Sequence, residues 1–146
     1  MATSERDLYY VAVKAFLELD GRFFILKDRY GDWDIPGGRI QRHEFGAPLE
    51  RVLERKLKEE LGEGVIYKVG KPVVFMRHER KESDLGGTKV RIFAVGYRVA
   101  FLGGEIRLSH QHTEAMWVSV KSFNPNRYFK GGWLKGVKEY LALRRK

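Results

Sequence analysis

The sequence contains 146 residues, the length of one ordinary domain, and we expect a single domain over residues 1–146. A hydrophobic content of 43% excludes a disordered chain. The lack of cysteine excludes a disulfide scaffold, a zinc–thiolate site and a cysteine nucleophile, and the lack of an apolar run of about 18 residues excludes a membrane span. A net charge of +9 favours partners that carry phosphate. The segment Met1–Asp7 is polar and lacks the apolar stretch of a signal peptide, so we expect a cytoplasmic protein.

The first part of the chain is predicted to form a β-hairpin. Tyr9–Leu19 and Arg22–Lys27 are rich in strand-forming residues, and Asp20-Gly21 between them tolerates the positive φ angles of a tight turn. The next segment, Tyr30–Arg42, contains three glycines and a proline, so we predict a loop there.

Pro48–Leu61 has the clearest helical pattern. Its apolar residues recur at steps of three and four, and Gly62 suits a C-terminal stop. On a helical wheel Glu60 falls inside the apolar stripe and Glu59 at its edge. Because a carboxylate in a buried seam is costly unless it is compensated, we expect either a hard cation such as Mg²⁺ or Mn²⁺ beside it or an ordinary salt bridge.

Further strands and a second helix follow. We expect strands over Val65–Met76, Lys89–Phe101 and Met116–Val120, an exposed charged loop over Arg77–Thr88, and an amphipathic helix over Trp133–Leu141. Strands interleaved with two helices predict an α+β fold with a mixed sheet covered by helices.

A glycine loop leads into the first helix in the segment Gly37–Gly62, whose sequence is GGRIQRHEFGAPLERVLERKLKEELG. The spacing of seven residues in it resembles the Nudix box of the Nudix hydrolase family: Gly38, Glu44, Arg55, Leu57, Glu59, Glu60 and Gly62. Trp33–Gly37 before the box and Trp117-Val118 after it extend the resemblance. It implies a Nudix-type α/β/α sandwich, with the mixed sheet between helices, and a metal-dependent hydrolase that cleaves a nucleoside diphosphate linked to another moiety.

The resemblance also implies roles for residues of the box. Glu59 and Glu60 would bind Mg²⁺ or Mn²⁺ together with a main-chain carbonyl of Gly37 or Gly38. Arg55 would orient a glutamate during catalysis. The substrate would be a nucleotide or a nucleotide sugar. The oligomeric state is not predicted, and a homodimer is one possibility.

The box departs from the family pattern in two important ways. Ten residues, not seven, separate Glu44 from Arg55, and we expect the extra residues to lengthen the loop, with Glu44 supporting the junction of loop and helix. Lys56 stands where the family has a glutamate that usually shares in metal binding. A lysine one turn before Glu60 should weaken a divalent site or pair with that glutamate.

Two arginines follow the glycine loop. Arg39 and Arg42 each present a planar fork that suits phosphate, and we predict that they contact the diphosphate of the substrate. The alternative is that both belong to a solvated basic loop.

A second candidate segment is the polar loop Ser109–Glu114, just before the Trp117 strand. In the family this loop often supplies a metal ligand or the general base, and Glu114 could serve as either. Gln111-His112 resembles a pair in the GDP-mannose mannosyl hydrolases, where the histidine is the base and water attacks the sugar carbon. A neutral imidazole is a competent base near pH 7, so His112 is the rival candidate, unless it is simply exposed.

A different class of function stays open. The chain could be a catalytically impaired module with this fold that binds RNA or a nucleotide through its basic surface. Lys56 and the net charge favour this alternative, whereas Arg55, Glu59 and Glu60 oppose it. Because positive charge without a base-reading element gives only weak binding, we expect weak contacts with nucleic acid and none with a membrane.

Overall fold

The computed structural model describes residues 5–82 and 85–146. The strands are β1 (Tyr10–Leu19), β2 (Arg22–Asp28), β3 (Trp33–Asp34), β4 (Gly37–Arg39), β5 (Ile66–Glu82), β6 (Thr88–Gly103) and β7 (His112–Ser119). The α-helices are α1 (Leu49–Leu61) and α2 (Gly131–Arg144), and short 3-10 helices are η1 (Arg42–Glu44) and η3 (Pro125–Arg127).

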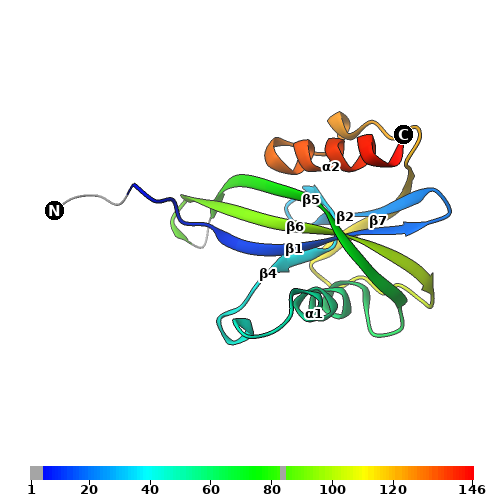
Figure 1. Ribbon diagram of the computed structural model, residues 1–146, viewed down its shortest axis with the longest axis horizontal. Coiled ribbons are helices and arrows are strands. Elements are labelled where there is room, and N and C mark those ends of the chain that lie inside the picture. The colour runs from blue at the N-terminus through cyan, green and yellow to red at the C-terminus, as the bar shows by residue number, and fades with distance from the viewer. Residues whose placement is uncertain (1–4, 83–84) are drawn as a thin grey trace.

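The strands of this described part form one mixed sheet, and the two α-helices cover its opposite faces (Figure 1). The order along the sheet is β3-β2-β1-β6-β5, with β4 paired to β1 and β7 paired to β2. The predicted α+β fold, an α/β/α sandwich with a mixed sheet between helices, is therefore confirmed.

Strand β1 lies at the centre of the sheet. It turns into β2 at Asp20 and Gly21, whose φ angles of 49° and 76° are those expected for the predicted tight turn. On one side β1 runs parallel to β6, and on the other Lys14 pairs with Gly37 of the antiparallel β4. This pairing fixes the glycine loop beside the middle of the sheet.

Each helix packs on its own apolar core. The stripe predicted for α1 is buried against one face of the sheet, through Val52, Leu53, Leu57 and Leu61. On the other face Tyr140 of α2 stacks on Phe16 of β1, with ring centres 4.0 Å apart. Within residues 5–82 and 85–146, neither helix is long and apolar enough to cross a membrane.

Some predicted loops were wrong. Tyr30–Arg42 contains β3 and β4, and most of Arg77–Thr88 belongs to β5 and β6, with residues 83 and 84 of that segment outside the described residues. The charged stretch forms a hairpin because its charges pair across the strands: Glu79 lies 3.5 Å from Lys89 and 3.1 Å from Arg91. Strand β7 begins at His112, so part of the predicted polar loop is also strand.

Candidate active site

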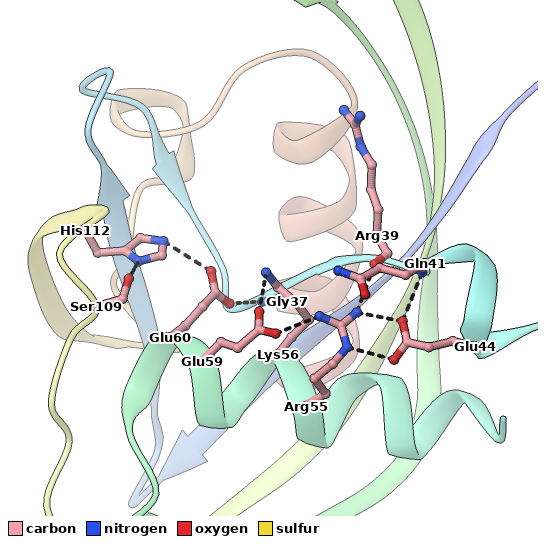
Figure 2. Close-up of polar contacts among 10 residues, drawn as sticks. All are labelled: Gly37, Arg39, Gln41, Glu44, Arg55, Lys56, Glu59, Glu60, Ser109 and His112. Atoms are coloured by element: carbon pink, nitrogen blue, oxygen red, sulfur yellow. Dashed lines mark hydrogen bonds and ion pairs between the residues drawn. The ribbon is translucent and has the colours of Figure 1, made fainter. Parts of the chain in front are cut away.

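The last turn of α1 brings a carboxylate against the glycine loop. Glu60 is 8% exposed, as its place in the apolar stripe predicted. Its Oε1 accepts a 2.7 Å hydrogen bond from the main-chain N–H of Gly37, and its Oε2 lies 3.1 Å from Nε2 of His112 (Figure 2). Both oxygens of the buried carboxylate therefore have polar partners, as a buried charge requires.

Arg55 ties the turn after the glycine loop to the helix. Its Nε and Nη2 each donate to the carboxylate of Glu44 at 2.7 Å, and its Nη1 donates to Glu59 at 2.9 Å. The hydrogen bonds from Arg55, helped by the N–H of Gln41, lower the pKa of Glu44 from 4.5 to about 2. Phe45 is 96% exposed, whereas Ala47 packs against the core under α1, so the longer loop turns outward at Phe45 and the Glu44–Arg55 contact is kept.

The Glu44–Arg55 pair gives a pH prediction. Folding lowers the pKa of Glu44 from 4.5 to about 2, so its contribution to stability is present above pH 4.5 and is lost as the pH falls toward 2. Glu44→Gln should melt at a lower temperature than the wild type at neutral pH, and the two melting temperatures should converge near pH 2. Thermal melts followed by circular dichroism measure this, and a constant gap down to pH 2 would contradict the assignment.

Glu59 lies at the edge of the apolar stripe of α1, and its side chain is 49% exposed. Its Oε2 is 3.1 Å from Nζ of Lys56. Partial burial opposes ionisation of Glu59, but the hydrogen bonds from Arg55 and Lys56 outweigh it, so its pKa is lowered. Lys56 therefore pairs with Glu59 rather than with Glu60, because both Glu60 oxygens are turned to the partners described above.

The segment after β6 closes the site at the end of α1. The N–H groups of Arg107 and Ser109 donate to the carbonyls of Leu61 and Glu60, at 2.8 and 3.1 Å. Oγ of Ser109 lies 2.9 Å from Nδ1 of His112. Because a carboxylate oxygen only accepts hydrogen bonds, Nε2 of His112 is the donor in its contact with Glu60, and Nδ1 faces the Ser109 hydroxyl. In this arrangement His112 is a donor to Glu60.

Glu114 lies on the other face of the sheet. Its carboxylate is 61% exposed and lies 4.0 Å from Nζ of Lys27 on β2. Met116, two residues along β7, packs in the core under α2. A register shift between Lys27 and Asp28 separates the pairing of Glu114 from that of His112. The structure thus brings His112, and not Glu114, to the carboxylates of α1.

The two arginines predicted to contact phosphate are not gathered at these carboxylates. Arg39 forms an ion pair with Glu82, its guanidinium lies 4.9 Å from the ring centre of Tyr10, and its side chain points away from the carboxylate pair (Figure 2). Arg42 is exposed on η1. Their role in substrate binding stays a prediction.

A cleft of about 560 Å³ opens on the α2 side, beside the strand that leads to the glycine loop. Asp34 lines it, and the buried Lys14 donates to both oxygens of Asp34 at 2.9 and 2.8 Å. Aromatic and basic side chains form much of the remaining wall: Trp33, His78, Arg80, Lys81, Arg127, Tyr128, Lys130 and Trp133. Sequence reasoning missed Lys14, although a lysine within an otherwise apolar strand was a signal.

His78 and Trp133 make one wall of this cleft. Their rings stack with centres 4.5 Å apart. Burial, with Arg80 nearby, lowers the pKa of His78, so its ring is neutral and Nδ1 accepts the N–H of Gly132 at 3.1 Å. The wall is therefore held in place at the start of α2.

A family model of the NUDIX domain matches residues 8–136, which is most of the chain. The chain belongs to the Nudix family. Among solved structures, the MutT protein of Methanosarcina mazei Go1 is 19% identical to this Nudix chain, with a TM-score of 0.73. The match covers 98% of this chain and 100% of the MutT chain. An ADP-ribose pyrophosphatase from Streptococcus suis is 16% identical, with a TM-score of 0.67 over 95% and 94% of the two chains.

A third structure, the ORF135 protein of E. coli, is 24% identical, with a TM-score of 0.66 over 94% of this chain and 92% of the other. Comparison with curated proteins gave no match. At these identities the structural likeness shows the Nudix fold alone. The family resemblance inferred from the box is confirmed.

Nudix hydrolases generally use a divalent metal ion, which requires oxygen ligands from the protein. Over residues 5–82 and 85–146, no group of three or more histidine, aspartate or glutamate side chains is arranged to hold a metal ion. Mg²⁺ is commonly bound by one or two protein carboxylates together with water and substrate phosphates. Glu59 and Glu60 are two carboxylates in the last turn of α1 beside the glycine loop, the number that such an ion needs from the protein, and each of their oxygens has a protein partner in this structure.

Proposed function

We propose that the protein is a divalent-metal-dependent Nudix hydrolase that cleaves a nucleoside diphosphate linked to another moiety, with nucleotide sugars as the first candidates. One observation carries the proposal: Glu59 and Glu60 share the last turn of α1, and Glu60 is held against the Gly37 amide of the glycine loop. Glu60 thus places a negative charge beside a main-chain loop that can meet a phosphate, and a divalent cation would be needed between the two negative groups.

The cleft on the α2 side supports a nucleotide substrate. It combines aromatic rings, which suit a base, with arginine and lysine side chains, which suit phosphate. Asp34 of the cleft is three residues before Gly37, whose amide contacts Glu60, so the two parts of the site adjoin along the chain. Under the proposal the nucleoside occupies the cleft and the diphosphate extends toward α1.

The residues of the last turn would then divide the work. Glu59, Glu60 and the carbonyl of Gly38 would hold a Mg²⁺ or Mn²⁺ ion, which would neutralise the diphosphate and help to activate water. Arg55 fixes Glu59, whose lowered pKa keeps it ionised at neutral pH. His112 orients Glu60.

The direct test is to incubate the protein with Mg²⁺ or Mn²⁺ and a mixed nucleotide pool, and to identify the consumed species by mass spectrometry. The pool should include ADP-ribose and nucleotide sugars beside nucleoside triphosphates. Selective loss of one diphosphate-linked species, which stops when the metal is chelated, is the expected result. A pool that stays unchanged at saturating metal would argue against hydrolysis.

The alternative is a module that binds RNA or a nucleotide without cleaving it, and Lys56 on Glu59 is the contact that favours it. We expect the basic surface to give only weak nucleic-acid binding that falls steeply as salt is raised, because such binding depends on counterion release. Fluorescence anisotropy with labelled single-stranded RNAs at low and high salt measures this. Sequence-selective binding that survives high salt would support the binding module instead.

A further inference from the structure

The side chain of Lys56 fills the space between α1 and the glycine loop. Its ammonium lies 3.1 Å from Oε2 of Glu59, and the side chain is 22% exposed. A Cβ atom added to Gly38 would lie 2.3 Å from Cε and 3.0 Å from Nζ of Lys56. The lysine therefore points along the glycine loop instead of out into solvent (Figure 2).

The charges around this ammonium form a small, nearly balanced set. Arg55 pairs with the carboxylates of Glu44 and Glu59, Lys56 pairs with Glu59, and Glu60 is the next residue of the same helical turn. The set keeps one net negative charge. A glutamate at position 56 would leave three, and such a site would repel a diphosphate until several positive charges were bound.

We propose that Lys56 is a built-in cation of the diphosphate site, and that its ammonium binds diphosphate oxygens directly in place of one divalent ion. Lysine is a compact point charge that suits phosphate, and its flexible stem lets the ammonium move from Glu59 to an anion at the glycine loop. Diphosphate binding then persists without metal, and divalent ions bind more weakly than they would beside a third carboxylate. This inference rests on the proposed function only in locating the diphosphate at the glycine loop.

Calorimetry with inorganic pyrophosphate in the presence of EDTA tests the first half. The wild type is expected to bind, and Lys56→Met and Lys56→Gln, which remove the charge, should each weaken binding by at least about tenfold. Lys58→Met is the matched control, because Lys58 is exposed two residues along the same helix. Thermal melts identify any variant that fails to fold, and the two substitutions at position 56 guard against that outcome.

Calorimetry with Mn²⁺ alone tests the second half. Lys56→Glu is expected to tighten Mn²⁺ binding by about tenfold or more, because it replaces a positive charge beside Glu59 with a negative one. The proposal is overturned if the wild type does not bind pyrophosphate in EDTA, if Lys56→Met and Lys58→Met lose the same affinity, or if Lys56→Glu binds Mn²⁺ no better. Neither measurement needs turnover, so an absence of hydrolysis would count against the proposed function and not against this role of Lys56.

Discussion

Glu60→Gln is expected to lower the rate of hydrolysis roughly a hundredfold or more while the protein stays folded. Glutamine keeps the size of the side chain, and its carbonyl oxygen can still accept the Gly37 N–H that Glu60 accepts at 2.7 Å. What is lost is the negative charge that would hold a divalent cation against the diphosphate, together with the acceptor for Nε2 of His112. Glu59→Gln should act in the same direction, because it removes the second carboxylate of the pair.

Steady-state rates at saturating Mg²⁺ and Mn²⁺ measure the effect on the substrate found in the nucleotide pool. Glu54→Gln is the matched control, since Glu54 is an exposed carboxylate on the same helix and should leave the rate nearly unchanged. Melting temperatures near the wild-type value exclude unfolding as the cause of a loss. Near wild-type rates for Glu59→Gln and Glu60→Gln at saturating metal would remove both residues from the proposed metal site.

The parts of the site that the sequence predicted well depend on local spacing. The 3.6-residue period of α1 placed Glu60 in the buried stripe and Glu59 at its edge, and the structure agrees. Glu44 was predicted to support the junction of loop and helix, and its ion pair with Arg55 does so, because the longer loop leaves the register of the helix unchanged. In both cases the geometry depends on residues close together in the chain.

The parts that the sequence did not predict depend on pairing between distant segments. The charged stretch before residue 83 forms a strand because Glu79 meets Lys89 and Arg91 across the hairpin, and no local pattern fixes that register. Lys14 appeared only as a polar residue in an apolar strand, and its partner Asp34 is 20 residues away. The shift at Lys27/Asp28 separates His112 from Glu114, although only Thr113 lies between them in the sequence.

That separation bears on which bond the enzyme would break. A base that serves attack at the sugar carbon was predicted from Gln111-His112, and a carboxylate base for attack at phosphorus from Glu114. His112 now has Glu60 on Nε2 and Ser109 on Nδ1, so both ring nitrogens have partners. Glu114 lies near Lys27 on the face of the sheet that α2 covers, whereas Glu60 belongs to α1 on the other face. The histidine is therefore better suited to hold Glu60 than to accept a proton from water.

Hydrolysis of a nucleotide sugar in ¹⁸O-labelled water is accordingly expected to give a nucleoside monophosphate and a sugar phosphate, with the label on a phosphate oxygen of one of them and no free sugar. His112→Gln should lower the rate by no more than about tenfold, because it loses an orienting donor to Glu60 and not the group that takes the proton. Its pH–rate profile should keep the same acidic limb as the wild type. Mass spectrometry of the products locates the label. Label in a released free sugar, together with loss of the acidic limb in His112→Gln, would assign the base to His112 and the attack to carbon.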